Sequence, residues 1–454
     1  MAAPFKAYDV RGIYGQDVTE ALAYQLGRAY VTFTGAKTVV VGRDMRPSSG
    51  PLSAELIRGL REAGARVISI GMASTDMLYF AVINLGVDGG VIVTASHNPG
   101  EYNGFKFVRE KAIPMGLESG LADLERLIAS EQLGPLAEAL GAYEVREVLD
   151  DFVAWMHEFV DPSKLKPLTV VIDAGNGMGG PIMERLFANS PVKVVPLFFE
   201  PDGTFPNHEA NPLLEENRRD LVAKVIEVGA DLGIGLDGDT DRAFFVDGKG
   251  QFCDGDFILG LLAKPILKAN PGATVIYDVR CSDYVRDTIA ALGGHAEMWK
   301  VGHAYAKTRM RELDATFGGE VSGHYYFKHK DAYFDSGNLT ALLLLKTLSD
   351  DGTSLEGAMA ETKRYHISGE INSRVADPDA IMTAIKTRYA EEGRVLEIDG
   401  LSVIADAWWF NIRKSNTEPL LRLNCEAKTR EQMEALRDAL LAQIRQVQTS
   451  PSFA

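Results

Sequence analysis

The feature that most constrains this chain is a regular alternation of short apolar segments with amphipathic ones, which runs from residue 38 to residue 317. The apolar segments are typical of buried strands, and the amphipathic segments repeat apolar residues at helical spacing. Strands that alternate with helices form mostly parallel sheets covered by helices. Three consecutive stretches share this plan. The sequence therefore predicts three similar α/β domains, although the three sequences differ too much to be called repeats.

The expected elements follow the same order in each stretch. In the first stretch we expect strands at 38–41, 66–70 and 91–94 and a helix at 52–62. In the second stretch we expect strands at 169–173, 192–198 and 232–236 and helices at 181–187 and 213–228. In the third stretch we expect strands at 274–278, 296–299 and 315–317 and helices at 283–292 and 304–312.

The last part of the chain departs from this pattern. Strands are expected at 403–404, 408–412 and 420–426, and long helices at 378–391 and 429–447. This arrangement predicts an α+β domain with a small sheet, which we interpret as a cap or lid. The whole pattern predicts four domains, at residues 1–147, 148–251, 252–365 and 366–454.

Charge and cysteine content exclude several classes of protein. The chain has 63 acidic and 47 basic residues, and this net charge of -16 argues against a nucleic-acid-binding or anionic-membrane surface. Its 3 cysteines show no CxxC spacing, which argues against a disulfide framework or a zinc site. The first ten residues do not resemble a signal peptide, and the apolar run 341–345 is too short to span a bilayer. We expect a cytoplasmic protein.

Two polar loops follow predicted strands directly and could carry chemistry. The turn Ser96-His97-Asn98-Pro99 follows the strand at 91–94, so Ser96 would face a cleft and could act as a nucleophile. Taken alone, this segment is better explained as an ordinary Asn-Pro turn in which Ser96 satisfies backbone groups. Asp237, Asp239 and Asp241 follow the strand at 232–236, and alternate carboxylates on one loop suit a hard cation such as Mg²⁺. A solvated acidic turn is the alternative.

Two further loops offer sites for a sugar and for a phosphate. The loop 318–324 presents Glu320, Ser322 and His324, whose donors and acceptors suit vicinal hydroxyls. The loop 413–419 lies between two strands, and Arg413 there could bind a phosphate bidentately. Ordinary polar loops are the alternative for both. A serine, a hard-metal site, a polyol loop and an anion clamp together indicate phosphoryl transfer to and from the protein.

The four segments together resemble the signature loops of the α-D-phosphohexomutases, in particular those of the bacterial phosphomannomutase/phosphoglucomutase branch. Residues 94–99 resemble the phosphoserine loop, 237–242 the magnesium loop, 319–324 the sugar-specificity loop and 413–419 the phosphate-binding loop. They occur in the family's order, and the resemblance covers nearly the whole chain. It implies an α/β fold of three similar domains with mixed, mostly parallel sheets, plus a C-terminal α+β domain, around a central cleft.

The resemblance also implies an activity and its residues. The chain would reversibly interconvert hexose 1-phosphates and hexose 6-phosphates through a phosphoserine, with Mg²⁺ and a hexose 1,6-bisphosphate intermediate, and hexose phosphates would be its small-molecule partners. The implied catalytic residues are Ser96, Lys106, Arg11, Arg242 and His303, and the implied metal ligands are Ser96, Asp237, Asp239 and Asp241. The implied substrate-binding residues are Tyr8, His97, Arg280, Glu320, Ser322, His324, Arg413, Ser415, Asn416 and Thr417.

Some alternatives stay open from the sequence. The ending Ser322-Gly-His324 also occurs in phosphoglucosamine mutases, whereas the stretch 201–207 looks more like phosphomannomutases. Val321 stands where Met or Gln is common in the family and leaves the preferred sugar open; Thr240 stands where Gly is common. A metal-assisted sugar-phosphate phosphatase is a further alternative. A sugar-phosphate-binding protein without catalysis is disfavoured, because a binder needs no nucleophile.

Overall fold

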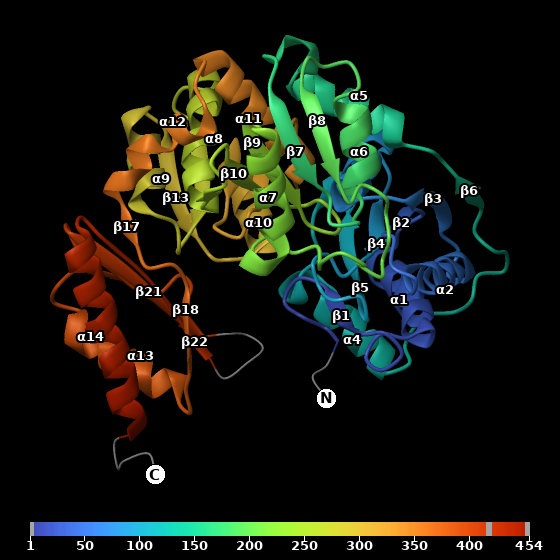
Figure 1. Ribbon diagram of the computed structural model, residues 1–454. Helices are drawn as coiled ribbons and strands as arrows, with labels where there is room; N and C mark the ends of the chain where they lie inside the picture. The colour runs from blue at the N-terminus through green and yellow to red at the C-terminus, as the bar shows by residue number, and fades with distance from the viewer. Residues whose placement is uncertain (1–3, 415–419, 450–454) are drawn as a thin grey trace.

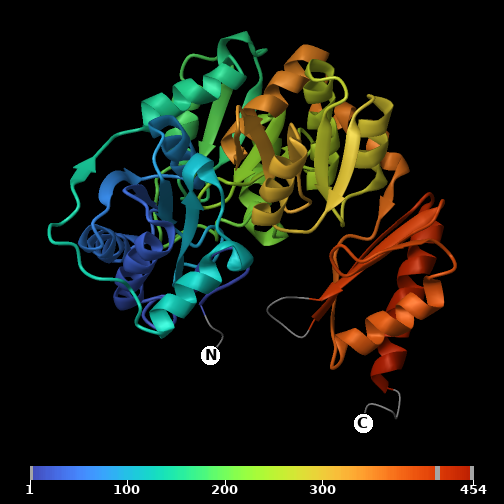
Figure 2. The ribbon, with the colours of Figure 1, turned by 180° about the vertical axis from the view of Figure 1, so that it is seen from behind.

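The computed structural model describes residues 4–414 and 420–449, with side chains up to residue 446. Four sheets follow one another along an arc, with the first and last at opposite ends of its open side (Figure 1). The view from behind shows the same arc, with the C-terminal part as a separate lobe (Figure 2). In the part of the chain that is described, no helix is both long enough and apolar enough to cross a bilayer.

The first sheet has the strand order β1-β5-β4-β2-β3-β6. Its strands are β1 (Val10–Ile13), β2 (Thr38–Arg43), β3 (Arg66–Met72), β4 (Gly89–Val93), β5 (Tyr102–Arg109) and β6 (Tyr143–Val145). Its helices are α1 (Glu20–Thr34), α2 (Ser49–Glu62), α3 (Thr75–Leu85) and α4 (Leu121–Ala129). Along β2, Val39 and Val41 belong to one hydrophobic core and Val40 to another, so both faces of the sheet are buried.

The second sheet has the order β11-β10-β9-β7-β8. Its strands are β7 (Thr169–Asp173), β8 (Lys193–Leu197), β9 (Leu232–Leu236), β10 (Ala243–Asp247) and β11 (Phe252–Cys253), with α5 (Leu149–Phe159), α6 (Gly179–Leu186) and α7 (Arg219–Val228). The third sheet has the order β13-β12-β14-β15-β16. Its strands are β12 (Thr274–Asp278), β13 (His295–Trp299), β14 (Phe317–Gly319), β15 (Tyr325–His329) and β16 (Ala332–Asp335), with α8 (Gly255–Ala269), α9 (Asp283–Ala291), α10 (His303–Leu313), α11 (Gly337–Asp351) and α12 (Leu355–Ala358).

The first three sheets share one core arrangement. The orders β3-β2-β4-β5, β8-β7-β9-β10 and β13-β12-β14-β15 are equivalent, with three parallel strands followed by one antiparallel strand. The predicted fold class, three similar α/β units with mixed sheets, is therefore confirmed. The helix expected at 213–228 is wrong at its start, because 215–218 form a short 3-10 turn and α7 begins at Arg219. There the Asn217 side chain donates to the Asn211 carbonyl, which competes with helical hydrogen bonding.

The C-terminal unit is an α+β layer with its own core. Its strands are β17 (His366–Ile367), β18 (Ile371–Arg374), β19 (Arg394–Leu396), β20 (Leu401–Ile404), β21 (Trp408–Lys414) and β22 (Leu420–Ala427), and its helices are α13 (Pro378–Tyr389) and α14 (Arg430–Thr449). All the strand pairs in this sheet are antiparallel. A separate hydrophobic cluster joins the sheet to both helices. The predicted α+β architecture is therefore confirmed.

Candidate active site

Three of the predicted loops occupy equivalent places in the fold. Each follows the third strand in the order that the three sheets share: the Ser96 loop follows β4, the Asp237 loop follows β9 and the Glu320 loop follows β14. Each then leads into the antiparallel fourth strand. The shared topology therefore delivers a serine, a carboxylate cluster and a polyol-type loop to one region. Residues from all three loops, together with Arg413 of the C-terminal unit, line one cleft of about 960 Å³.

Ser96 lies at the floor of this cleft in a strained backbone conformation. Its φ of 52° is unusual for a residue other than glycine, and it is only 2% exposed. The Ser96 Oγ donates a hydrogen bond to Asp237 Oδ2 at 2.6 Å and accepts one from Arg242 Nη2 at 2.9 Å. A carboxylate and a guanidinium therefore meet at the one hydroxyl predicted to carry a phosphoryl group.

The three aspartates form a tight, buried group. Asp237, Asp239 and Asp241 each offer a carboxylate oxygen within 4.8 Å of the others. Lys106 Nζ lies 2.7 Å from Asp239 Oδ2 and 2.5 Å from Asp241 Oδ2. Arg242 Nη2 lies 2.9 Å from Asp237 Oδ2. The cluster thus holds three carboxylates against two cations, which leaves negative charge to attract a further cation.

The donor set fits a hard metal ion. The Oδ1 atoms of Asp239 and Asp241 are buried, and no residue in the described ranges donates a hydrogen bond to them. Buried carboxylate oxygens that accept no hydrogen bond are costly unless a cation lies beside them, and Asp241 Oδ1 has only the more distant Arg242 Nε, at 3.6 Å, and His324 Nε2, at 3.7 Å. All the possible ligands here are oxygens, which suits Mg²⁺. The residues present therefore fit the predicted magnesium site.

The pKa values of this cluster diverge. Burial raises the pKa of the Asp237 carboxyl to about 7, against the opposing effect of Arg242. Burial also disfavours ionisation of Asp241, but Lys106 outweighs it and holds the pKa of Asp241 well below its usual value. Burial disfavours the charge on Lys106, yet Asp239 and Asp241 raise the pKa of Lys106 above its usual value. Lys106 is therefore charged at neutral pH.

The sugar-type loop is prearranged by its own hydrogen bonds. Glu320 is buried, and its carboxylate accepts from Gly302 N at 2.6 Å and from Ser322 Oγ at 2.8 Å. Burial opposes ionisation of Glu320, but His324 and Arg280 hold its pKa well below the usual range. Both Glu320 and Ser322 line the cleft, where they can meet hydroxyl groups of a ligand.

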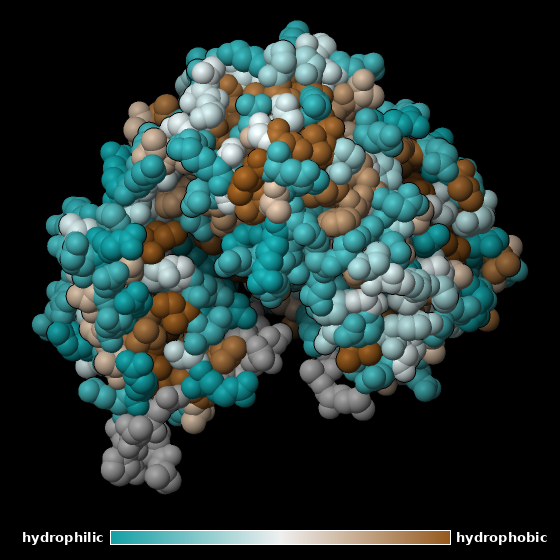
Figure 3. Space-filling view, viewed as in Figure 1, coloured by the Kyte–Doolittle hydropathy of each residue, from teal (hydrophilic) through white to brown (hydrophobic). Residues whose placement is uncertain are grey.

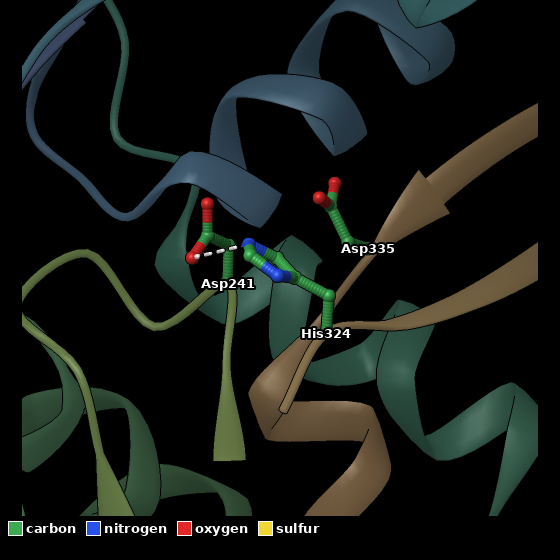
Figure 4. A group of neighbouring side chains, drawn as sticks. All are labelled: Asp241, His324 and Asp335. Atoms are coloured by element: carbon green, nitrogen blue, oxygen red, sulfur yellow. Dashed lines mark ion pairs between the residues drawn. The ribbon is translucent and has the colours of Figure 1, made fainter. Parts of the chain in front are cut away.

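His324 links this loop to the acidic cluster. Its Nε2 lies 3.7 Å from Asp241 Oδ1, and Figure 4 shows the two side chains together, with Asp335 beyond the ring. Asp241, His324 and Asp335 form a second group whose ligand atoms lie within 4.8 Å. Asp335 was not predicted from the sequence, because it ends β16 and becomes a neighbour of Asp241 only when the second and third units pack together.

His303 begins α10 and lies beside His324, with ring centroids 5.9 Å apart. Its Nδ1 lies 3.6 Å from Asp335 Oδ2. Burial, and then Lys307, hold the pKa of His303 well below its usual value, so the ring is neutral at neutral pH. A neutral imidazole on the cleft wall can accept a proton from a ligand hydroxyl.

The N-terminal segment supplies further cleft residues. Arg11 donates to Asn98 Oδ1 at 2.7 Å and pairs with Asp9. The Tyr8 hydroxyl donates to the Val301 carbonyl at 2.8 Å. His97 contacts Arg242, and burial together with Arg242 holds the pKa of His97 well below its usual value. These residues bring the start of the chain against both the serine loop and α10.

Three arginines gather at the far side of the cleft. Arg413 Nη2 donates to Glu370 Oε2 at 2.9 Å, and Arg422 Nη1 donates to Glu370 Oε1 at 3.2 Å. Arg280 pairs with Asp278 at 2.7 Å, and its Nη1 lies 3.9 Å from Glu370. Three guanidinium groups share the carboxylates of Glu370 and Asp278, which leaves positive charge that can attract an anion. The predicted residues Ser415, Asn416 and Thr417 lie outside the described residues.

Arg422 was missed by the sequence analysis. It lies directly opposite Arg413 in the β21–β22 pairing. Only the register of this strand pairing identifies it, because opposite residues in an antiparallel pair point to the same face. The space-filling view shows a notch between the two ends of the arc, and the coloured residues directly above it are largely hydrophilic (Figure 3).

Comparisons with known proteins give the family. Domain profiles described as phosphoglucomutase/phosphomannomutase alpha/beta/alpha domains I, II and III match residues 2–133, 150–250 and 254–365. The profile for the C-terminal domain of the same family matches residues 370–443. A phosphomannomutase of Salmonella typhimurium is 44% identical over 451 residues, which are 97% of this chain and 99% of that protein.

Other relatives agree with this assignment. A phosphomannomutase of Escherichia coli is 43% identical over 432 residues, covering 93% of this chain and 94% of that protein. The solved structure of a phosphoglucomutase/phosphomannomutase family protein from Burkholderia thailandensis is 34% identical, with a TM-score of 0.88 and 98% of both chains covered. From its four-part fold, its domain profiles and these relatives, the chain belongs to the phosphoglucomutase/phosphomannomutase family.

Proposed function

We propose that the chain interconverts hexose 1-phosphates and hexose 6-phosphates as a phosphomannomutase/phosphoglucomutase, with Ser96 as the phosphoryl carrier. One observation carries the proposal: the Ser96 hydroxyl lies between Asp237 and Arg242 on a cleft whose other side holds three arginines. Members of this family are isomerases, and the named relatives are phosphomannomutases. The four predicted domains, 1–147, 148–251, 252–365 and 366–454, would each contribute one loop to the reaction.

The reaction balances as two phosphoryl transfers. In the first transfer, the P–O bond to Ser96 breaks while a bond forms between phosphorus and a free hydroxyl of the hexose phosphate. That hydroxyl loses its proton, the Ser96 oxygen gains one, and the product is a hexose 1,6-bisphosphate. In the second transfer, the other phosphate of the bisphosphate moves to the Ser96 oxygen, which loses its proton, while the P–O bond to the sugar breaks and the sugar oxygen gains a proton to become a hydroxyl. The phosphoserine is regenerated, so the net change is isomerisation.

The protonation states of His303 and Lys106 support roles for them in proton transfer. His303 is neutral and can take the proton of the attacking hydroxyl, whereas Lys106 is charged and can donate to an oxygen of the phosphoryl group or leaving group. Arg242 and Arg11 would stabilise charge on the phosphoryl group in flight. Asp237, Asp239 and Asp241, with an oxygen of phospho-Ser96, would hold Mg²⁺. When bound, this ion would supply charge neutralisation at the transferring phosphoryl group.

The two ends of the cleft divide the binding task. Glu320 and Ser322 would hold sugar hydroxyls in either substrate orientation, and His324 would support them. Arg280 and Arg413 would hold the phosphate that is not reacting, together with Ser415, Asn416 and Thr417. Tyr8 and His97 would border the sugar and the serine loop. Closure of the C-terminal lobe over the cleft would exclude water from the phosphoserine.

The decisive experiment replaces the proposed nucleophile. Ser96→Ala should lose nearly all mutase activity, and intact-protein mass spectrometry should find no phosphate on the variant after incubation with glucose 1,6-bisphosphate. Ser163→Ala, at an exposed serine, is the matched control and should behave as the wild type. Full activity of Ser96→Ala without bound phosphate would overturn the mechanism.

The same assay separates the alternative functions. Mannose, glucose and glucosamine 1-phosphates should be compared as substrates, with free phosphate measured in parallel. A mutase exchanges isomers with little phosphate release and is stimulated by catalytic hexose 1,6-bisphosphate. A phosphatase would release phosphate steadily, and a preference for glucosamine 1-phosphate would reassign the chain to phosphoglucosamine mutases. The relatives are named phosphomannomutases, which supports mannose phosphates as substrates of this chain.

A further inference from the structure

The strained conformation of the Ser96 loop needs an explanation outside the cleft. A φ of 52° at a serine persists only when the surroundings hold the backbone in place. The structure assigns this task to Arg46, which we propose is a positioning residue that keeps the Ser96 hydroxyl in its reactive place. The inference rests on the proposed function, because it gives Arg46 a role in phosphoryl transfer to and from Ser96.

The Arg46 guanidinium binds the serine loop through its backbone. It donates to four carbonyl oxygens, those of Ser96 at 3.0 Å, Asn98 at 2.5 Å, Pro99 at 2.6 Å and Tyr102 at 3.0 Å. These acceptors span the whole connection from the end of β4 to the start of β5. Arg46 is 1% exposed, and its hydrogen bond to the Ser96 carbonyl is fully buried, so water does not compete for that contact.

Arg46 is itself held from two sides. Its Nε lies 3.2 Å from Asp44 Oδ2, and its backbone N donates to Asp44 Oδ1 at 3.0 Å. The Phe205 ring covers the guanidinium, with the carbon of that group 5.0 Å from the ring centroid. A side chain at Gly203 would come within 2.4 Å of the Arg46 Cα, so the second unit packs directly against this residue. Arg46 therefore lies at the junction between the serine-bearing unit and the unit with the aspartates.

This arrangement gives a use to the stretch 201–207, which the proposed chemistry did not need. The segment belongs to the second unit, and through Gly203 and Phe205 it holds Arg46 against the serine loop. Gly238 of the aspartate loop approaches from the other side, because a side chain there would come within 2.4 Å of the Ser96 carbonyl oxygen. The same carbonyl group thus contacts Arg46 on one side and the aspartate loop on the other.

A comparison within the chain supports a dedicated role. An aspartate followed two positions later by an arginine occurs directly after β2, as Asp44–Arg46, and at the end of β12, as Asp278–Arg280. Both arginines pair with their own aspartate. Arg280 lines the cleft, whereas Arg46 lies behind the serine loop and reaches its carbonyls. In the first unit, the aspartate–arginine pair therefore contacts the loop that carries the proposed nucleophile.

The consequence concerns phosphoryl transfer more than substrate binding. A lysine at position 46 keeps the positive charge. Its single ammonium nitrogen has only three N–H donors, so it cannot replace the planar guanidinium that donates to four carbonyl oxygens. The loop would then relax, and a displacement of the hydroxyl by about 1 Å can reduce a reaction rate on the order of 100-fold. Binding of the hexose phosphate depends on the groups lining the cleft and should change little.

The test uses full-length protein loaded with radiolabelled phosphate on Ser96 by incubation with labelled glucose 1,6-bisphosphate. Single-turnover transfer of the label to mannose 1-phosphate should be slower in Arg46→Lys on the order of 100-fold. Its KM for mannose 1-phosphate should stay within about twofold of wild type. Arg61→Lys is the matched control, since Arg61 donates to the Gly141 carbonyl of another loop in the same unit and should transfer label normally. Phe205→Leu, which removes only the ring over Arg46, should slow transfer by a smaller factor.

The outcomes are separable. If folded Arg46→Lys transfers its label as fast as Arg61→Lys, the positioning role is wrong. If Arg46→Lys does not fold, Phe205→Leu decides the question, and a wild-type transfer rate in that variant refutes the role. Ser96→Ala tests the underlying function in the same experiment: label taken up by that variant would refute Ser96 as the carrier, whereas failure of the Arg46 prediction alone would leave Ser96 intact.

Discussion

Replacing Lys106 by methionine tests the charge balance of the aspartate cluster. Lys106 is 4% exposed, and the two carboxylates that it contacts, at 2.5 and 2.7 Å, are equally buried. Methionine fills a similar volume but removes the positive charge, so three carboxylates would face Arg242 alone. Removing one partner of a buried ion pair costs about 3–5 kcal/mol, because the remaining charge has lost both its solvent and its partner. We expect a loss of this size in the metal-free protein.

The control is an exposed pair of similar geometry. Lys111 Nζ lies 2.5 Å from Asp331, but the two side chains are 56% and 67% exposed. Water and salt screen such a pair, so Lys111→Met should change the free energy of unfolding by less than about 1 kcal/mol. Urea denaturation in the presence of a chelator would measure both variants. Equal losses in the two variants, or no loss in Lys106→Met, would refute the electrostatic reasoning.

Magnesium provides the second arm of the same experiment. A divalent cation beside the aspartates would replace the charge that the variant lacks, so Mg²⁺ should stabilise Lys106→Met more than it stabilises the wild type. An equal gain in both proteins would mean that the ion binds elsewhere or that Lys106 does not neutralise the cluster. Mutase activity should nonetheless stay low in the variant with Mg²⁺, on the order of 100-fold below wild type, because the proposed proton donor is missing.

Three other predictions address the rest of the site. Arg413→Ala should raise the KM for hexose phosphates by about tenfold or more with a smaller effect on kcat, because it removes a bidentate phosphate contact; steady-state kinetics would measure this, and an unchanged KM would remove the clamp assignment. Gly238→Ala should lower activity at least about tenfold, because its side chain would meet the Ser96 carbonyl oxygen at 2.4 Å; wild-type turnover would show that the loops have room to separate. Burial raises the pKa of Glu426 to about 8, so its proton stabilises the fold at low pH and this contribution is lost as pH rises toward that value. Between about pH 5 and about pH 8 the melting temperature of Glu426→Gln should therefore fall less than that of the wild type. An equal fall in both proteins would contradict the raised pKa of Glu426.

The polar loops could be predicted from the sequence because they are local. In each, a run of apolar residues ends and polar residues follow at once, as at Ser96 after β4 and Asp237 after β9. The alternation of strands and helices likewise predicted the α/β units, since it depends on neighbours a few positions apart. The buried helix α11 gave a weaker signal: eleven of its 15 residues are buried, so its polar face is narrow and the helical period of its sequence is faint.

Other parts of the site depend on contacts between distant segments. Lys106 meets Asp239 across 133 positions of sequence, and Arg46 reaches the carbonyls of a loop about fifty positions away. Neither residue has a local pattern that marks it, because a single lysine or arginine is normally a solvated surface residue. Their positions follow from how the sheets pack.

The sequence by itself determined the chemistry that each unit offers: a serine, three carboxylates, a polyol-type loop and an arginine-bearing hairpin, each placed by the end of its own strand. Only the tertiary structure decided that these groups share one cleft, that Lys106 and Arg242 neutralise the aspartates, and that Arg46 holds the serine loop from behind. The physical reason is that the two kinds of interaction act over different separations along the chain. Strand and turn preferences act between neighbours along the chain, whereas desolvation and charge pairing act between groups brought together by packing of whole units.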